Sequence, residues 1–326
     1  MEDAGKKYRI VSLDTHTLSV GDLDFSVIEA LGDVKFYDIL TEEEILKVTR
    51  DAEMLLVNKV NVTRKLIDNC PDLKYVGTYS TGYNNVDLAA LNERGIVCCN
   101  VPGYSTHAVC QHVFALLLMA EGSTDHYRAS VDAGDWVKSK SFCYFKWPMF
   151  EVFGKTFGVY GYGSIGRAVA RVAEAFGMKV LVHSRTQPKD CPYEYVSEDE
   201  IFRRSDYLSL HCPLTAATEK MINAASLAKM KKSAVLINTA RGGLVDEAAL
   251  AEALNSGTIR GACLDVLTQE PMEQGNPLLG ARNCIITPHI AWGPAETRAR
   301  LLNIVAENIK AFINGKPQNV VNGNVK

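Results

Sequence analysis

A glycine-rich turn between two apolar runs constrains the fold of this chain more than any other feature. In VYGYGSIGRAVARVAEAFGMKVLV, the glycines at 161, 163 and 166 follow a strand-like run and open an amphipathic helix that leads to a second strand-like run. Gly161 permits a tight turn, Gly163 lets the backbone approach a pyrophosphate, and Gly166 lets helix and strand pack closely. Free amides at the helix N-terminus would face the phosphates. The context predicts a dinucleotide-binding unit, with a plain tight turn as the alternative.

Strand and helix patterns alternate on both sides of this turn. The strand-like runs before residue 102 are YRIVSL, MLLV, LKYVGT and IVCCNV, and those after residue 155 are TFGVYGY, MKVLVHS, YLSLHCP, AVLINTA, GACLDVL and NCIITPH. Between the two blocks lie a long helical pattern from Ser105 and an irregular aromatic segment, 135–150. Such alternation predicts an α/β fold with parallel sheets covered on both faces.

The last helical pattern, AETRARLLNIVAENIKAFINGK, comes too late in the chain to be another crossover. We therefore expect it to pack back on the first block and to make that domain discontinuous. The prediction is two doubly wound domains: a flavodoxin-like substrate domain of residues 1–101 plus 294–326, and an inserted Rossmann NAD(P)-binding domain of residues 102–293. We expect the active site in a cleft between them that closes on ligand binding.

Composition excludes several classes of function. Hydrophobic residues make up 47% and charged residues 22% of the 326 residues, and the net charge of −3 argues against nucleic acid or an anionic membrane as partner. The longest apolar run, VFALLLMA, is far shorter than the roughly 20 residues of a membrane span. Without a signal-peptide pattern at the N-terminus, a cytoplasmic protein is expected. The nine cysteines are scattered without a CxxC pair and no HExxH occurs, so we expect reduced cysteines and no metal site.

The position where dinucleotide folds usually place an acid carries Ser184, Arg185 and Thr186. A carboxylate there would bind the ribose hydroxyls of NAD and would repel a 2′-phosphate. Hydroxyls and a guanidinium instead suit phosphate oxygens. Asp190, six residues beyond Ser184, is a poor substitute. These residues favour NADP over NAD, although a solvated arginine in a site that accepts NAD is the alternative.

Three strand-like runs of the second block end in residues that one reaction needs. AVLINTA runs into Arg241, GACLDV ends near Asp265 with Glu270 five residues on, and NCIITP runs into His289. Each alone is unremarkable, as a turn, solvated or structural residue. Oxidising a 2-hydroxy acid requires a cation for the carboxylate, an acid/base near neutral pKa, and a carboxylate to orient it. Arg241, His289 and Glu270 fit these roles, and a nicotinamide would take the hydride.

With these residues the chain resembles the D-isomer-specific 2-hydroxyacid dehydrogenases, through GYGSIG, LHCPLT, LINTARGGLVDEAAL, LDVLTQEP and ITPHIAW in the family's order. The resemblance implies that Arg241 binds and polarises the substrate, that His289 is the acid/base oriented by Glu270, and that Asp265 meets the nicotinamide carboxamide. The remaining cofactor contacts expected are Ser164, Ile165, Cys212, Pro213, Thr218, Thr239 and Ala240.

Several features are similar to those of the family's glycerate dehydrogenases, also called hydroxypyruvate reductases. They include Gln111 in AVCQHVFALLL, Lys59 in VNKV and Trp292 in HIAW, of which Lys59 and Trp292 are expected to bind substrate. For the family as a whole, Ser80, Thr81 and Gly82 match the loop whose amides hold the substrate carboxylate. The alternatives are that Lys59 is only a surface charge, that Ser80-Thr81-Gly82 is only a β-turn, and that Trp292 is only a packing residue. Hydroxypyruvate reduction to D-glycerate is the favoured reaction, with phosphoglycerate or D-lactate dehydrogenase as alternatives and a nucleotide-sensing, corepressor-like binding protein as the different class. The resemblance also implies a homodimer with residues 105–150 as the contact.

Overall fold

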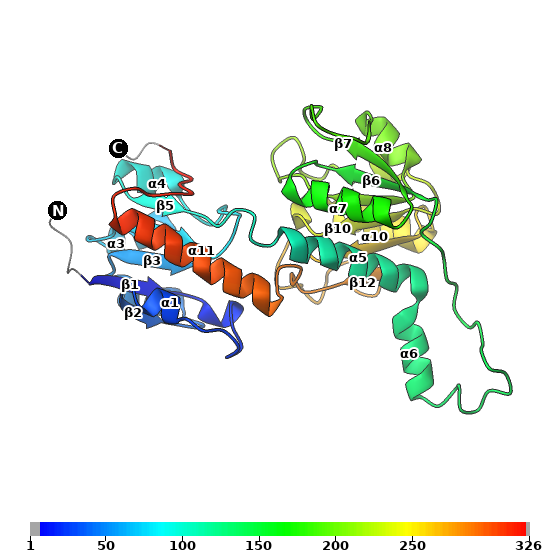
Figure 1. The fold of residues 1–326 in the computed structure, drawn as a ribbon, viewed down its shortest axis with the longest axis horizontal. Coiled ribbons are helices and arrows are strands. Elements are labelled where there is room, and N and C mark those ends of the chain that lie inside the picture. The colour runs from blue at the N-terminus through cyan, green and yellow to red at the C-terminus, as the bar shows by residue number, and fades with distance from the viewer. Residues whose placement is uncertain (1–6, 324–326) are drawn as a thin grey trace. The chain divides into compact units, whose positions relative to one another are not determined.

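The computed structural model describes residues 7–323, which form two compact units (Figure 1). Among the described residues, one unit contains 7–105 and 293–323, and the other contains Thr106–Trp292. The expected boundaries, after residues 101 and 293, differ slightly from these because the chain runs on irregularly past Val101 until helix α5 begins at Thr106.

The first unit is built on a five-stranded parallel sheet of order β2-β1-β3-β4-β5, which is the flavodoxin-like order. Its elements are β1 (Tyr8–Ser12), α1 (Ser26–Glu29), β2 (Gly32–Phe36), α2 (Glu42–Thr49), β3 (Met54–Val57), α3 (Arg64–Asn69), β4 (Tyr75–Thr78), α4 (Leu88–Glu93), β5 (Val97–Cys99) and α11 (Ala295–Ile313). The strands β3, β4 and β5 are buried along their whole length, as expected for a sheet covered on both faces.

Helix α11 belongs to this unit, which confirms the prediction that the last helical pattern returns to the first block. It packs against α1 and β4, and Figure 1 shows it lying across the sheet. The ring of Phe312 lies 5.0 Å from that of Tyr75. The amide of Asn308 donates to the carbonyl of Asn100 at 2.9 Å, so the helix is tied to the end of β5 as well as packed on the sheet.

The second unit has a seven-stranded parallel sheet of order β12-β11-β10-β9-β6-β7-β8, which contains the Rossmann order. Its elements are α5 (Thr106–Gly122), α6 (Thr124–Asp132), β6 (Thr156–Tyr160), α7 (Ser164–Ala175), β7 (Lys179–His183), β8 (Glu194–Tyr195), α8 (Glu198–Arg204), β9 (Tyr207–Leu210), α9 (Ala224–Leu227), β10 (Val235–Asn238), α10 (Glu247–Ser256), β11 (Gly261–Leu264) and β12 (Cys284–Ile286). Successive strands are added in one direction from β6 to β8 and in the opposite direction from β9 to β12, so the strand order reverses between β6 and β9. The crevice at such a switch point is where dinucleotides bind.

Helices cover both faces of this sheet, each over its own apolar core. On one face α5 and α7 pack on residues such as Phe157 and Val159. On the other, α8 and α10 cover Leu208 and Leu236. The capping predicted for α10 is confirmed: the Asp246 side chain accepts from the N–H of Ala249, and Gly257 at the other end has a φ of 73°.

The segment after α5 departs from this compact body. Figure 1 shows α6 and the stretch that follows it extending away from the sheet of the second unit. The expected irregular aromatic segment lies in this stretch, which contains no helix or strand between Ala133 and Lys155. We refer to residues 124–153 as the arm.

Candidate active site

The glycine turn joins β6 to α7 with the close contacts predicted for it. Gly161 has a φ of 100°, and a Cβ there would lie 2.6 Å from the backbone N of Cys212. A Cβ on Gly166 would lie 2.1 Å from the carbonyl oxygen of Gly161. At Gly163 a Cβ would meet nothing within 4 Å, so the backbone there is open to an approaching group. No side chain caps α7, whose first turn begins at Ser164 and Ile165, which leaves its amides for an anion.

The ends of β9 and β10 carry the other expected cofactor residues. Cys212 and Pro213 follow β9, and the Thr218 hydroxyl donates to the carbonyl of Pro213 at 2.7 Å. Beyond β10, the N–H of Ala240 donates to the Asn238 side chain at 3.0 Å. The neighbouring Thr239 hydroxyl is buried and has no hydrogen-bond partner among residues 7–323. A buried hydroxyl left over in this way fits a bound polar group, so the residues present suit a dinucleotide.

At the end of β7 hydrogen bonds hold the backbone around Arg185. The Tyr195 hydroxyl donates to the carbonyl of Ser184 at 2.7 Å, and the Ser184 hydroxyl donates to the carbonyl of Thr186 at 2.8 Å. Arg185 is exposed between them. Asp190 accepts from both terminal nitrogens of Arg167, at 3.0 and 2.9 Å. These bonds from Arg167 hold the pKa of Asp190 below its usual value. The one carboxylate of this loop is therefore already paired.

Arg241 follows β10 at the start of a short 3-10 turn, Gly242–Leu244. Its carbonyl accepts from the Asn238 amide at 2.9 Å, and its guanidinium donates to the carbonyl of Ala240 at 2.7 Å. A Cβ on Gly242 would lie 1.9 Å from the backbone of Leu267, so only glycine fits beside Arg241. The strand end thus fixes the backbone of a cation at the carboxyl edge of the sheet.

Two other expected catalytic residues meet directly. Nδ1 of His289 lies 2.7 Å from Oε2 of Glu270, while Oε1 of Glu270 accepts from the N–H of Leu267 at 3.0 Å. The side chains are 25% and 35% exposed, so both are within reach of a ligand. The indole of Trp292 donates to the carbonyl of His289 at 3.0 Å. This arrangement leaves Nε2 of the imidazole for proton exchange, with its other nitrogen held by a carboxylate.

The backbone of His289 is held in turn by Asp265, at the end of β11. His289 has a φ of 55°, in the left-handed region that is uncommon for a residue with a side chain. Its N–H donates to the carbonyl of Asp265 at 2.8 Å, and the Asp265 carboxylate, 1% exposed, accepts from the N–H groups of Ile290 and Ala291 at 2.9 and 2.8 Å. These contacts give Asp265 a structural role. Its expected contact with a nicotinamide stays a prediction.

In the first unit, Lys59 lies in a loop held by a residue that the sequence analysis did not select. The Asp14 carboxylate, 5% exposed, accepts from the N–H groups of Asn58, Lys59 and Val60 at 3.0, 2.7 and 2.6 Å. Asp14 itself has a φ of 50°. Three donors on one buried carboxylate fix this loop firmly.

The Ser80-Thr81-Gly82 turn of the same unit is held by its own contacts. The Ser80 hydroxyl donates to the carbonyl of Gly82 at 2.6 Å, and the Thr81 hydroxyl donates to that of Val101 at 2.7 Å. The Asn100 amide donates to the carbonyl of Thr81 at 2.7 Å. The Ser80 and Thr81 side chains therefore shape the turn, and its expected contact with a substrate carboxylate stays a prediction.

Within residues 7–323, no group of three or more His, Cys, Asp or Glu side chains is placed to hold a metal ion. In the same part of the chain, no helix combines the length and apolar character needed to cross a membrane.

A Rossmann sheet with an open glycine turn, together with a paired histidine and carboxylate and an arginine at the ends of its strands, defines a nicotinamide-dependent oxidoreductase. Residues 114–291 match the family model described as "D-isomer specific 2-hydroxyacid dehydrogenase, NAD binding domain". The chain is 42% identical to a hydroxypyruvate reductase from Blautia hydrogenotrophica over 96% of its length and 99% of that protein. It is 45% identical to a glycerate dehydrogenase from Methylorubrum extorquens over 86% of its length and 89% of that protein. The chain belongs to the D-isomer specific 2-hydroxyacid dehydrogenase family.

A solved structure with the same fold is that of an NADPH-dependent glyoxylate/hydroxypyruvate reductase from Sinorhizobium meliloti in complex with NADP and malonate. It has a TM-score of 0.81 and 30% sequence identity, and the match covers 98% of both chains. The two-domain α/β fold expected from the sequence is thereby confirmed over nearly the whole chain.

Proposed function

We propose that this protein reduces hydroxypyruvate to D-glycerate with NADPH. The observation that carries the proposal is the pair of His289 and Glu270, 2.7 Å apart, in the same unit as Arg241 and the glycine turn. The relatives named hydroxypyruvate reductase and glycerate dehydrogenase support the choice of substrate. The nine free cysteines support a reducing compartment, so we place the reaction in the cytoplasm.

The proposed chemistry adds a hydride and a proton across the C2 carbonyl. The nicotinamide, when bound, supplies the hydride. His289 gives the proton on Nε2 to the carbonyl oxygen, and Glu270 holds the ring through Nδ1 and stabilises its charged form. Arg241 binds the substrate carboxylate and polarises the carbonyl, a role that suits the fork of a guanidinium. In the reverse direction the same imidazole accepts the hydroxyl proton.

We further propose that Lys59, the Ser80-Thr81-Gly82 turn and Trp292 bind the substrate. Lys59 offers a cation on a loop fixed by Asp14, and the turn offers backbone N–H groups. Trp292 presents its ring beside the reacting histidine because its indole N–H is engaged by the carbonyl of His289. These contacts would select a small, polar 2-keto acid.

The preference for NADPH rests on the end of β7. Arg185 makes no hydrogen bond or ion pair with any residue in the described range, and the nearby Asp190 is occupied by Arg167. A free guanidinium without a free carboxylate beside it suits a 2′-phosphate. The Sinorhizobium meliloti reductase, which is NADPH-dependent, supports the same preference.

Initial rates with hydroxypyruvate, measured with NADPH and NADH over a range of concentrations, test the cofactor. We expect a lower KM for NADPH, and Arg185→Asp should raise that KM by roughly tenfold or more while leaving the KM for NADH within about twofold. Lys189→Asp, in the same exposed loop, serves as the control. A lower KM for NADH in the unmodified protein would overturn the preference.

A panel of 2-keto acids tests the substrate. With saturating NADPH, kcat/KM should be highest for hydroxypyruvate when it is compared with glyoxylate, pyruvate and phosphohydroxypyruvate. A maximum for pyruvate or phosphohydroxypyruvate would identify a D-lactate or phosphoglycerate dehydrogenase instead. Tight NADPH binding without turnover of any of the four would favour a nucleotide-sensing protein.

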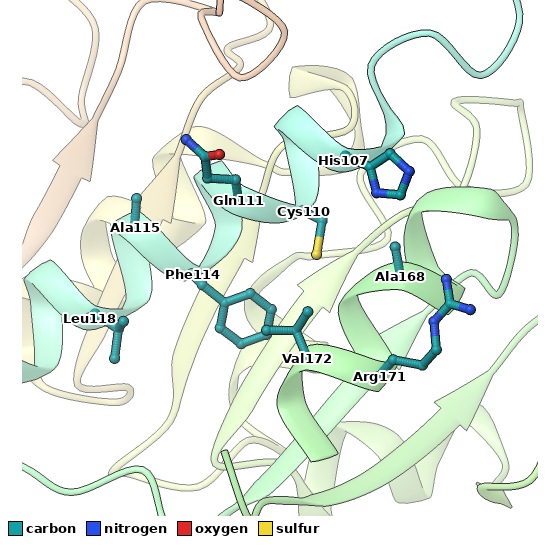
Figure 2. A pocket seen from close by; sticks show the side chains of 9 residues that line it. All are labelled: His107, Cys110, Gln111, Phe114, Ala115, Leu118, Ala168, Arg171 and Val172. Carbon is teal, nitrogen blue, oxygen red and sulfur yellow. The ribbon is translucent and has the colours of Figure 1, made fainter. Parts of the chain in front are cut away.

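We also propose that the protein is a homodimer whose arm is covered by a second copy. In the arm, Trp136, Phe142 and Phe145 are 52%, 88% and 79% exposed. Exposed apolar surface of this kind is typical of a protein–protein contact. The same unit carries an apolar groove between α5 and α7, lined by residues such as Phe114, Leu118 and Val172. Figure 2 shows Phe114 and Val172 directed toward each other in this groove. In the proposed dimer a second copy covers these exposed rings and this apolar groove.

Sedimentation measures the oligomeric state directly. The unmodified protein should sediment at twice the 35.8 kDa mass of one chain. The double variant Phe142→Ser, Phe145→Ser should shift toward the monomer, while Val20→Ser, an exposed apolar residue of the other unit, should not. A monomer at micromolar concentration for the unmodified chain would refute the homodimer.

A further inference from the structure

A second histidine lies against the network that holds His289. Nε2 of His112, on α5, is 2.9 Å from the hydroxyl oxygen of Thr287 and 3.4 Å from Oδ1 of Asp265. The Thr287 hydroxyl lies 2.6 Å from the same Oδ1. The His112 side chain is 18% exposed, and His112 has no role in the mechanism proposed above.

The hydrogen atoms of this network can be assigned from its distances. Thr287 has one hydroxyl hydrogen, and its 2.6 Å contact to a carboxylate oxygen has the length of a charge-assisted bond, so the hydroxyl donates to Asp265. The Thr287 oxygen must then accept from His112, which therefore carries a hydrogen on Nε2. Burial acts to raise the pKa of Asp265, but hydrogen bonds from His112, Thr287 and the loop backbone outweigh it and hold the pKa below its usual value.

The network joins the two ends of the second unit. Helix α5 starts at Thr106, the first residue of the unit, and the loop that Asp265 holds ends close to Trp292, its last residue. His112 is 175 residues before Thr287 in the chain. The left-handed backbone of His289 is unfavourable for a residue with a side chain and persists only if its surroundings impose it. Contacts from a separate helix supply such a constraint.

We propose that His112 is a positioning residue for His289. Its Nε2–H fixes Thr287 against Asp265, and Asp265 then fixes the backbone of residues 289–291, so that the imidazole of His289 stays at hydrogen-bond distance from Glu270. The proposal rests on the proposed function in taking His289 as the acid/base. It concerns how the imidazole is oriented, since the polar contacts of His112 are with Thr287 and Asp265.

A pair of substitutions separates the hydrogen bond from the volume of the ring. His112→Gln keeps a donor near the position of Nε2, whereas His112→Phe fills the space without one. We expect His112→Phe to lower kcat for hydroxypyruvate by roughly 10- to 100-fold, as for a catalytic group displaced by about 1 Å, and His112→Gln to restore it to within about threefold. The dissociation constant of NADPH should change by less than about twofold in both. A merely structural role would lower thermal stability and leave kcat of the folded protein unchanged.

A double-mutant cycle tests the route through Thr287. Thr287→Val removes the hydroxyl, and adding His112→Phe to it should lower kcat no further, because both act through one contact. Full additivity would overturn the route. Wild-type kcat in His112→Phe, or equal losses in the Phe and Gln variants, would overturn the positioning role.

Failure of this inference can be told apart from failure of the proposed function. His289→Ala, measured alongside, reports on the acid/base: if it is inactive while His112→Phe is fully active, only the positioning role fails. The ring proton signals of His289 in the NMR spectrum report its surroundings without turnover. These signals should shift in His112→Phe and return in His112→Gln, even if hydroxypyruvate proves to be the wrong substrate, and unchanged signals in both variants would overturn the inference.

Discussion

Nδ1 of His289 lies 2.7 Å from Oε2 of Glu270, a residue 19 positions earlier in the chain. The pair forms because β11 and β12 are neighbours in the sheet, so the loops after both strands meet at one edge. An imidazole fixed in this way by a carboxylate presents its other nitrogen in one orientation, which is what proton transfer to a bound carbonyl needs.

Glu270→Gln should lower kcat by roughly 10²-fold, because the amide can accept the hydrogen bond but cannot stabilise a charged imidazole. The KM for NADPH should stay within about twofold. Steady-state rates with hydroxypyruvate measure both constants. Glu273→Gln, an exposed acid in the same loop, is the matched control and should behave like the unmodified protein. Equal kcat values for the two variants would contradict the role of Glu270.

Asp14→Ala should weaken substrate binding at a distance. It removes the shared acceptor of the N–H groups of residues 58–60, of which that of Asn58 is buried, and releases the loop that carries Lys59. We expect the KM for hydroxypyruvate to rise by roughly tenfold, with kcat and the dissociation constant of NADPH much less affected. Asp24→Ala removes an exposed carboxylate of the same unit and should leave the KM unchanged. An unaltered KM in Asp14→Ala would show that the loop does not depend on this carboxylate.

His211 should make the stability of the protein fall in mild acid. Burial lowers the pKa of His211 from 6.5 to about 3, so the folded state keeps the ring neutral while the unfolded chain takes up a proton. Its contribution is fully present above pH 6.5 and is lost as the pH falls from there toward 3. Between pH 7.5 and 5.5 the free energy of unfolding should fall by about 1 kcal/mol more in the unmodified protein than in His211→Asn. Chemical denaturation at both pH values measures this difference, and parallel losses would contradict it.

Arg260→Met should be strongly destabilising. Arg260 pairs with Glu121, whose side chain is 2% exposed, and it also lies 4.5 Å from the centre of the Phe150 ring. Removing the cation leaves a buried carboxylate without its partner, at a cost of about 3–5 kcal/mol in the free energy of unfolding. Denaturant titration measures the loss.

Two further variants make the Arg260 result specific. Glu121→Gln combined with Arg260→Met should recover part of the loss, because no charge is then left buried. Arg128→Met breaks an exposed pair with Asp132 and should change stability little. If Arg260→Met and Arg128→Met lowered the free energy of unfolding by equally small amounts, the buried pair of Arg260 and Glu121 would not stabilise the fold as predicted.

The sequence predicts most of this fold because the central strands are apolar along their whole length. β3, β4, β9, β10 and β11 are buried at every position, and such runs stand out between helical patterns. The elements that the sequence analysis missed lack this signal. β2 lies at a sheet edge, has no fully buried residue and reads GDVKF. β8 has two residues, and α6 is polar with one buried residue.

The candidate catalytic residues could be selected because each follows a recognisable strand. The supporting residues Asp14 and His112 could not be selected in this way. Asp14 accepts from amides more than 40 positions away, and His112 contacts a hydroxyl 175 positions away. Local periodicity carries no information on such contacts. A weak signal existed for His112, a polar residue within the apolar helix AVCQHVFALLL.

In the proposed reaction His289 supplies the proton that completes reduction. The most direct test is the single-turnover rate at which enzyme-bound NADPH is oxidised on mixing with hydroxypyruvate, in the unmodified protein and in His289→Ala. We predict a loss of roughly 10²- to 10⁴-fold in His289→Ala with NADPH binding unchanged. A rate in His289→Ala close to that of the unmodified protein would show that His289 is not the proton donor.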